Sequence, residues 1–182
     1  MVIRNMGIHS SRERIEARRS HEATIASLYD EYYDKIARYA YAHVGNRSEA
    51  EDIAGEVFLK ALDSLESYEE RGVPIQGWLF RIAHNLVVDY LRRSAKRKTV
   101  PIDGVQIEAD TDPVASAERN IELERVEEAM KNITREQREI LRLRFFGGLT
   151  SKEVGSLMHK SDGAVREMQR AALEKLRKQL IE

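Results

Sequence analysis

The stretch GWLFRIAHNLVVDYLRRSAKRK, residues 77–98, decides how the chain is organised. Apolar residues recur in it at helical spacing, which predicts a helix that buries one face in a core. A set of polar side chains recurs at steps of four, four and three, and so forms one row on another face. This row consists of Arg81, Asn85, Asp89 and Arg92. The stretch therefore indicates a core helix that also presents a patterned polar surface.

The same helix ends in a run of cations. The run consists of Arg92, Arg93, Lys96, Arg97 and Lys98, with no acid among them. One or two cations suffice to complement the macrodipole at a helix C-terminus. The surplus indicates either a helix end that is simply solvated or a surface that binds a polyanion, and charge alone does not separate these interpretations.

Composition narrows the classes of protein that fit. The chain has 182 residues and a formal net charge of −1, so the basic run is a local asymmetry. The absence of cysteine excludes disulfides, thiol catalysis and cysteine-based zinc sites, and fits a cytoplasmic protein. Three prolines and ten glycines predict an all-α protein. With no apolar run of membrane-spanning length and no secretory signal, we expect no membrane insertion.

The sequence divides into four segments. Residues 1–20 are polar and basic and predict a flexible extension with a short helical piece around 12–19. Residues 21–99 hold three expected helices, which would form one small antiparallel domain. Residues 100–116 contain sparse, unperiodic apolar residues and predict a flexible linker. Residues 117–182 form a second small helical domain.

The linker is acidic. Its acids are Asp103, Glu108, Asp110 and Asp112. Because they follow the cations of residues 92–98 directly, they could screen those cations or imitate nucleic acid. Plain solubility is an equally good interpretation, so the linker charge by itself assigns no function.

The first two helices are bounded by capping signals. The first runs over residues 22–44 and ends at Gly45 and Asn46, because glycine readily takes the left-handed conformation that ends helices. Ser48 is the expected N-cap of the second helix, and Glu51 would reach back to complete a capping box. This second helix is expected to continue to about residue 64.

The second helix has one ambiguity on its buried face. Either Leu59 or Phe58 fills the position that the apolar spacing leaves open. Phe58 falls toward the polar side, next to exposed acids, and a partly exposed aromatic in such a setting is typical of a partner-binding patch.

The second domain carries two more capping signals. Thr134 with Gln137, and Thr150 with Glu153, each match the capping-box pattern. After the second box, a helix of about two turns is followed by a tight connection and a last long helix that Ser161 would cap. This spacing predicts a helix-turn-helix.

The start of the last helix would face DNA. In a helix-turn-helix, residues at this point meet base edges in the major groove. Here they are Ser161, Asp162, Gly163, Ala164, Arg166, Glu167 and Arg170. The small residues let the backbone approach phosphate, and a helix N-terminus itself attracts anions. An ordinary capped hairpin would share part of this pattern, but Arg166 and Arg170, one turn apart, favour DNA binding.

The two basic elements suggest different forms of DNA. The helix-turn-helix suits duplex, whereas residues 77–98 and the loop before them combine cations and Asn85 with aromatic rings. These rings are Trp78 and Tyr90 within the stretch and Tyr68 in the preceding loop. Aromatic rings stack on unpaired bases while cations follow the backbone, so this mixture suits melted DNA. A chain that holds duplex at one end and unpaired DNA at the other indicates strand opening at a promoter.

At this point the chain resembles bacterial sigma factors of the extracytoplasmic-function (ECF) group. AEDIAGEVFLKAL (50–62) resembles the region 2 segment that binds the polymerase clamp, and GWLFRIAHNLVVDYLRR (77–93) resembles the segment that recognises and melts the −10 element. LTSKEVGSLMHKSDGAVREMQRAALEKLR (149–177) is similar to region 4, which reads the −35 element. The resemblance covers roughly residues 22–98 and 119–180. It implies a non-enzymatic initiation factor with core RNA polymerase, promoter DNA and an anti-sigma factor as partners, and no cofactor or metal.

The resemblance also implies roles for individual residues. Core polymerase would contact Asp52, Glu56 and Phe58. The −10 surface would consist of Tyr68, Trp78, Arg81, Asn85, Asp89, Arg92, Arg93, Lys96 and Arg97, and the loop at about 66–76 would help to select a flipped base. The −35 surface would be the set from Ser161 to Arg170 named above. Asp89 more naturally orients a neighbouring arginine than contacts DNA, and Trp78 fits either the core or a stacking surface.

The sequence departs from the family pattern at two positions. Gly55 stands where glutamine is usual, which would weaken one polymerase contact, and Ala171 stands where arginine is common. Two rival interpretations remain. A helix-turn-helix regulator would bind duplex without polymerase, although the pattern of residues 77–98 argues against it. An enzyme lacks support, because the five histidines are scattered without metal-site spacing and no phosphate-loop or nucleophile motif occurs.

Overall fold

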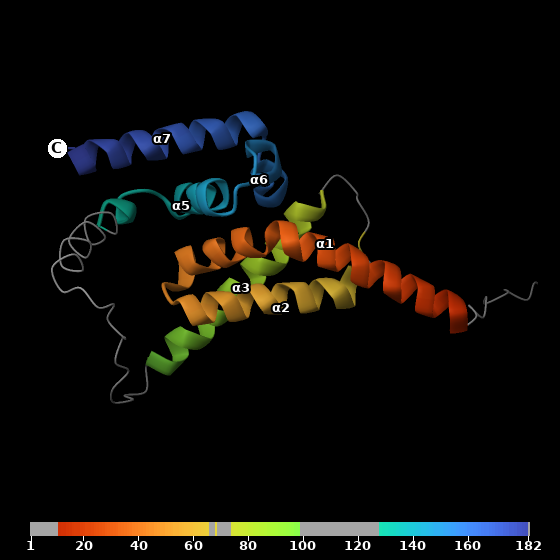
Figure 1. Ribbon diagram of the computed structural model, residues 1–182. Coiled ribbons are helices and arrows are strands. Elements are labelled where there is room, and N and C mark those ends of the chain that lie inside the picture. Colours follow the sequence, from red (N-terminus) through yellow and green to blue (C-terminus); the bar gives the residue numbers. More distant parts are fainter. Residues whose placement is uncertain (1–10, 66–67, 69–73, 99–127, 182) are drawn as a thin grey trace, which may run out of the picture.

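The chain folds as a layered set of helices (Figure 1). The structure is a computed structural model and describes residues 11–65, 68, 74–98 and 128–181. The elements in these ranges are α1 (Ser11–Val44), α2 (Arg47–Ser64), α3 (Ile75–Lys98), α5 (Arg135–Leu141), the π-helical turn η2 (Arg142–Phe146), α6 (Ser151–Met158) and α7 (Asp162–Ile181). The described residues contain no strand, as the all-α prediction requires. The expected linker, residues 100–116, lies outside the described residues.

Helix α1 begins earlier than predicted. It starts at Ser11, so the helical piece expected around 12–19 is continuous with the helix that was predicted to begin at residue 22, and residues 1–10 lie outside the description. The physical reason is helix propensity, because the segment is rich in arginine and glutamate and contains neither glycine nor proline. The N-terminal end of α1 consequently extends beyond the helices that pack on it (Figure 1).

The connection between α1 and α2 is shorter than expected. Gly45, with φ of +71°, ends α1 as predicted. The N-cap of α2 is Asn46 and not Ser48, because the Asn46 side chain accepts a 3.0 Å hydrogen bond from the backbone N–H of Glu49. Asparagine caps as well as serine does, so the first available cap after the glycine is the one used.

Helix α2 packs Phe58 inward, which corrects the prediction of an exposed aromatic. Only 5% of Phe58 is exposed, and its ring lies 5.0 Å from that of Tyr29 and 6.3 Å from that of Tyr33. Leu59 is 66% exposed instead. The reason is visible in the spacing of the buried side chains, which follow one helical stripe and include Phe58. This stripe consists of Ala50, Ile53, Ala54, Val57, Phe58 and Ala61.

The second unit, α5 to α7, begins with two capping boxes as predicted. The Thr134 side chain accepts from the Gln137 N–H and the Gln137 side chain accepts from the Thr134 N–H. Thr150 and Glu153 repeat this arrangement at the start of α6. Between the two helices, η2 is followed by Gly148 with φ of +68°, which turns the chain toward α6.

The two helical units share one hydrophobic core. Residues of α1, α2 and α3 form a continuous cluster with buried residues of the second unit. The second unit contributes Ile140, Leu143, Leu149, Val154 and Val165. Helix α6 lies against α3, and η2 against α1, so that the second unit covers one side of the first (Figure 1). No helix among the described residues is long and apolar enough to span a membrane.

Candidate nucleic-acid interface

The helix-turn-helix is built as the sequence predicts. Helix α6 ends at Met158, and His159 takes the left-handed conformation with φ of 56°. The Ser161 hydroxyl then accepts a 3.1 Å hydrogen bond from the Ala164 N–H and caps α7. The cap defines where α7 begins, and the exposed side chains of its first turns lie where a ligand could contact them.

Gly155 makes the turn possible, a role that the sequence interpretation missed. A Cβ atom at this position would lie 2.6 Å from the carbonyl oxygen of Lys160. The Lys160 N–H in turn donates a 2.9 Å hydrogen bond to the Gly155 carbonyl. Only glycine allows the two segments to approach this closely. The available signal was a glycine inside a short, strongly amphipathic helix, where it costs helix propensity.

The predicted −35 residues gather on one exposed surface at the start of α7. Gly163, Ala164, Arg166, Glu167 and Arg170 are exposed, and Asp162 is partly buried. Two ion pairs order this surface. Arg166 donates to Asp162 across 2.5 Å, and Arg170 donates to Glu167 across 3.0 Å. Each ion pair therefore restricts the orientation of its arginine side chain on the surface of α7. Such exposed pairs contribute little to the stability of the fold.

The predicted −10 residues line α3. Arg81, Asn85, Asp89, Arg92, Arg93 and Lys96 are all exposed, while the Arg97 side chain is outside the description. Arg92 lies 3.4 Å from the Asp89 carboxylate, which agrees with the expectation that Asp89 orients an arginine. The opposite face of α3 buries Leu79, Phe80 and Val87, as the apolar spacing predicted.

The sequence left open whether Trp78 belongs to the core or to a stacking surface, and in the structure it has features of both. It is partly buried and packs against the shared core. Its ring also lies 4.9 Å from that of Tyr68, at an interplanar angle of 39°. The two aromatic rings therefore form one partly exposed pair at the start of α3, where an unpaired base could stack.

A groove joins the α3 surface to α2. It has a volume of about 640 Å³. Its lining consists of Glu56, Lys60, Asp63, Ser64, Ile82, Asn85, Leu86, Asp89 and Arg93. Three of the residues predicted for DNA therefore lie beside Glu56, which was predicted for polymerase. The sequence interpretation missed Lys60 and Asp63, although their spacing from Glu56 places them on the same face of α2.

The predicted polymerase-binding residues are only partly brought together. Asp52 and Glu56 are exposed on α2, and Glu56 lies 3.6 Å from Lys60. Phe58 is buried and so cannot offer its ring to a partner. Leu59 occupies the exposed apolar position beside these acids. At Gly55 an added Cβ would meet no atom within 4 Å, so packing does not require glycine there.

Both halves of the chain match family models. Residues 28–97 match Sigma-70 region 2, and residues 129–178 match Sigma-70, region 4. ECF RNA polymerase sigma factor SigD of Mycobacterium tuberculosis is 32% identical over 152 residues, which cover 80% of this chain and 72% of SigD. The chain is an ECF sigma factor. Members of this family are transcription initiation factors of RNA polymerase and are not known as enzymes.

Other relatives place the sigma factor in the same group. ECF RNA polymerase sigma factor BldN of Streptomyces coelicolor is 32% identical over 169 residues, which cover 90% of this chain. The sigma factor spans 63% of the length of BldN. The structure of CnrH in complex with the cytosolic domain of CnrY superimposes with a TM-score of 0.63 at 20% identity, covering 91% of this chain and 93% of that one. This likeness shows a common fold.

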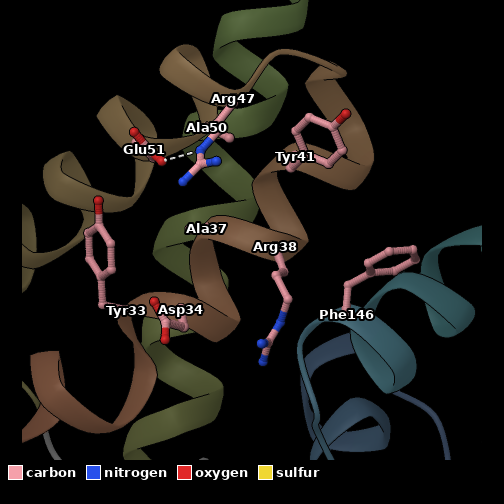
Figure 2. Close-up of a pocket in the computed structure, with 9 residues that line it drawn as sticks. All are labelled: Tyr33, Asp34, Ala37, Arg38, Tyr41, Arg47, Ala50, Glu51 and Phe146. Atoms are coloured by element: carbon pink, nitrogen blue, oxygen red, sulfur yellow. Dashed lines mark hydrogen bonds and ion pairs between the residues drawn. The ribbon is translucent and has the colours of Figure 1, made fainter. Parts of the chain in front are cut away.

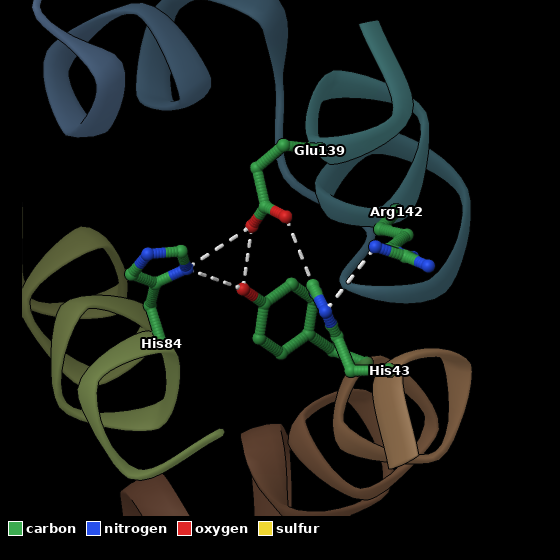
Figure 3. Close-up of polar contacts among 5 residues, drawn as sticks. His43, His84, Glu139 and Arg142 are labelled. Atoms are coloured by element: carbon green, nitrogen blue, oxygen red, sulfur yellow. Dashed lines mark hydrogen bonds and ion pairs between the residues drawn. The ribbon is translucent and has the colours of Figure 1, made fainter. Parts of the chain in front are cut away.

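Five polar residues lie where regions 2 and 4 of the sigma factor meet, and we call them the interface cluster (Figure 3). The cluster consists of Tyr39 and His43 of α1, His84 of α3, Glu139 of α5 and Arg142 of η2. The carboxylate of Glu139 is at its centre. It accepts a 2.6 Å hydrogen bond from the Tyr39 hydroxyl and lies 3.2 Å from His43 Nε2 and 3.3 Å from His84 Nδ1.

The hydrogen-bond donors and acceptors of the interface cluster determine which of its atoms carry protons. Arg142 can only donate, so His43 Nδ1, 3.3 Å away, is the acceptor and the proton of the neutral ring lies on Nε2. Tyr39 gives its single proton to Glu139, so its oxygen accepts from His84 Nδ1 at 3.0 Å. Burial alone would raise the pKa of Glu139, but the His43 and His84 rings and the Tyr39 hydroxyl outweigh it and lower that pKa. Glu139 is therefore an anion.

Acidification is expected to destabilise the fold through His43. Burial lowers the pKa of His43, and the Arg142 charge acts in the same direction against the opposing effect of Glu139. A histidine with a lowered pKa contributes its full stability above the unfolded pKa of about 6.5 and loses it as the pH falls. Protonation at Nδ1 would also place a second cation against Arg142. Tyr39 does not titrate in this range, since burial raises its pKa well above the ordinary value.

The measurement is thermal unfolding at about pH 7.5 and about pH 5.5, where histidine changes charge. The wild-type protein should lose more stability on acidification than His43→Gln, whose side chain stays neutral. Because His84 also faces Glu139 and remains in both proteins, the difference between them isolates His43. Equal losses in the two proteins would contradict the assignment.

Proposed function

We propose that this sigma factor binds core RNA polymerase, directs it to promoters with −35 and −10 elements, and assists in opening the −10 element. The observation that supports the proposal is the presence, in one chain, of two differently built exposed surfaces whose side chains suit DNA. The start of α7 offers small residues and two oriented arginines, whereas α3 offers a polar row, cations and an aromatic pair. We infer that the protein acts in the cytoplasm, where the polymerase is.

Region 4 would read the −35 element with the start of α7. Gly163 and Ala164 allow the helix N-terminus to approach a phosphate, where backbone N–H groups and the helix dipole favour an anion. Arg166 and Arg170 would reach base edges, and a bidentate contact to guanine is the most favourable use of an arginine in the major groove. Asp162 and Glu167 would position these arginines through the ion pairs described above.

Region 2 would hold the melted −10 element on α3. Arg81, Arg92 and Arg93 provide positive charge along the helix, and Asn85 can donate to and accept from a base edge. The Tyr68–Trp78 pair would supply a stacking surface for an unpaired base. Extruding a base costs a few kcal/mol, and these contacts would offset the cost.

Core polymerase would bind the exposed face of α2. Asp52 and Glu56 supply charge, and Leu59 supplies the apolar contact that Phe58 cannot make. A central apolar contact surrounded by charged residues is the usual anatomy of a protein interface. The groove between α2 and α3 would bring the polymerase and the unpaired DNA next to each other.

An anti-sigma factor is a further partner that we propose. A second groove of about 630 Å³ lies between α1, α2 and η2 (Figure 2). Its lining includes Tyr41 of region 2, which is 50% exposed, and Phe146 of region 4, which is 43% exposed. Arg38 and Asp34 add charge of both signs. A protein seated in this groove would touch both regions at once and hold them together.

Run-off transcription with bacterial core polymerase tests the proposed function. The template is the DNA upstream of the gene for this protein, and reactions are compared with and without it. A transcript that depends on the protein supports the proposal and locates a promoter. Absence of both a transcript and co-purification with core polymerase would favour a regulator that binds duplex DNA alone. If the protein binds core polymerase without a transcript, a library of templates replaces the first one.

Asn85→Ala should impair promoter opening more than promoter binding. Asn85 is exposed on the −10 surface and lies in the groove between α2 and α3, so its removal leaves the fold intact. Loss of a base contact costs about 1–3 kcal/mol, or roughly 5- to 150-fold. Permanganate reactivity of unpaired thymines measures opening, and a pre-melted template should restore transcription. Normal opening by the variant would remove Asn85 from the −10 surface.

A further inference from the structure

Arg144 joins three parts of region 4 that are separate in the sequence. It belongs to η2, and its guanidinium Nε donates a 3.0 Å hydrogen bond to the side-chain oxygen of Gln169 on α7. Its Nη1 donates to the backbone carbonyl of Leu149, the residue before the N-cap of α6. One side chain therefore links η2, the start of the helix-turn-helix and the helix that carries the −35 surface.

Gln169 lies at the border between the buried and the exposed faces of α7. Successive residues are turned by about 100° around a helix, so Gln169 falls between the fully buried Val165 and the exposed Arg166. The Gln169 side chain is itself partly buried. A bond that holds Gln169 in place also holds the rotation of α7 about its own axis, and with it the direction of Arg166 and Arg170.

The other contacts of α7 described above do not supply this control. The two ion pairs of the −35 surface join residues within α7, so they orient the arginines relative to the helix but not the helix relative to region 4. Val165 and Ala172 attach α7 to its neighbours by apolar contact, which is non-directional. A hydrogen bond is directional, because it weakens steeply as its angle departs from linear. The bond from Arg144 to Gln169 is therefore suited to set the rotation of α7.

We propose that Arg144 is a positioning residue for the −35 surface. Through Gln169 it sets the rotation of α7, and thereby the selectivity of the sigma factor for base sequence, without touching DNA itself. The inference rests on the proposed function for this consequence, since it concerns how region 4 distinguishes one duplex sequence from another. The bond between η2 and α7 is a property of the folded chain alone.

The geometry of the site requires arginine. The guanidinium is a planar fork with donors in fixed directions, so it can serve Gln169 and Leu149 at the same time. Leu149 is 2% exposed, and a carbonyl shielded from water requires a donor. The lysine ammonium is a single charge on a flexible stem, which can keep the bond to the carbonyl while losing the bond to Gln169. Arg144→Lys therefore keeps the charge and removes the link to α7.

A selectivity measurement on the polymerase holoenzyme tests the proposal. Selection from duplexes randomised over about one helical turn, roughly 10 base pairs, yields the sequence that the wild-type protein prefers. Discrimination is the ratio of the affinities for this sequence and for a scrambled one. Arg144→Lys and Gln169→Ala should each lower the ratio by about fivefold, the lower end of the loss for one base contact. The matched control is Arg138→Lys, a partly buried arginine of region 4 that lies on α5, and it should discriminate as wild type does.

Two further variants separate positioning from direct contact with DNA. Arg144→Gln removes the charge and should leave the salt dependence of binding unchanged. A salt slope smaller by about one unit, with equal weakening on selected and scrambled DNA, would show a phosphate contact and overturn the proposal. The double variant Arg144→Lys/Gln169→Ala should discriminate no worse than either single variant, because residues that act as a pair are not additive. Losses that add would mean that Gln169 contacts DNA independently, which also contradicts the proposal.

Residual dipolar couplings of the backbone N–H groups test the structural part without DNA. In the full wild-type chain the couplings of α6 and α7 should fit one rigid arrangement. In Arg144→Lys and in Gln169→Ala the couplings of α7 should shift or shrink relative to those of α6, while circular dichroism shows that both variants remain folded. Unchanged couplings in both variants would overturn the proposal.

The couplings also keep the proposal separate from the proposed function. If the wild-type holoenzyme selects no sequence, the proposed function fails, and the couplings still decide whether Arg144 orients α7. If Arg144→Lys does not fold, Gln169→Ala removes the same bond from the α7 side and decides both measurements.

Discussion

Phe80→Ala is expected to destabilise the whole protein by about 3–5 kcal/mol, the range for removing a buried aromatic ring. Phe80 is fully buried in α3 and contacts both Tyr39 of region 2 and the Gly147 backbone of region 4. The cavity would therefore lie between the two regions and weaken both. For a chain of this size the melting temperature should fall on the order of 10 °C. Calorimetry and circular dichroism measure the change.

The shape of the transition matters as much as its midpoint. Because one hydrophobic core spans both regions, we expect them to unfold in a single cooperative step in the wild-type protein. Leu59→Ala, at a position that is 66% exposed, is the matched control and should change stability by no more than about 0.5 kcal/mol. Two separate transitions in the wild type, only one of which responds to Phe80→Ala, would show that the regions fold independently.

Arg166→Ala is expected to weaken binding of the polymerase holoenzyme to the −35 element by about 5- to 150-fold, equivalent to about 1–3 kcal/mol. The side chain is exposed at the start of α7 and held by Asp162, so the substitution would remove the proposed DNA contact without touching the core. Fluorescence anisotropy with a promoter fragment measures the affinity. The same variant should lose discrimination against a fragment with a scrambled −35 element.

Two further variants sharpen this prediction. Arg177→Ala removes the same type of side chain from an exposed position further along α7 and should leave discrimination unchanged. Asp162→Asn keeps Arg166 but removes its 2.5 Å ion pair. It should raise affinity for unrelated DNA, because one repelling carboxylate is lost, and lower discrimination, because the arginine is no longer held. Equal losses from Arg166→Ala and Arg177→Ala would indicate a general electrostatic effect in place of −35 recognition.

Local signals explain the parts of the fold that the sequence predicted correctly. The capping boxes at Thr134 and Thr150 and the cap at Ser161 depend on neighbouring residues alone, so the helix-turn-helix followed from the sequence. The polar row of α3 also followed, because helical spacing fixes which side chains share a face. Membership of the family that this pattern resembled is confirmed by the matches to regions 2 and 4.

The sequence predictions were wrong or incomplete in two situations. In one, two neighbouring residues could both fill the same structural role; in the other, the position of a side chain depended on contacts with a distant segment of the chain. Asn46 and Ser48 were both competent caps, and the earlier one was used. Phe58 was misplaced although the stripe of small and apolar residues on α2 included it; the rings of Tyr29 and Tyr33 complete its environment. Glu139 looks like any charged residue of a helix, and only the packing of α5 against α1 and α3 reveals its role.

The shared core also bears on how long the protein survives in a cell. When the two regions separate, Leu143 and Val154 of region 4 and Phe80 of region 2 lose their cover together. Exposed apolar surface of this kind marks a chain for chaperones and proteases unless another protein covers it. A substitution that loosens the packing between the two regions is thus expected to shorten the lifetime of the protein in a cell.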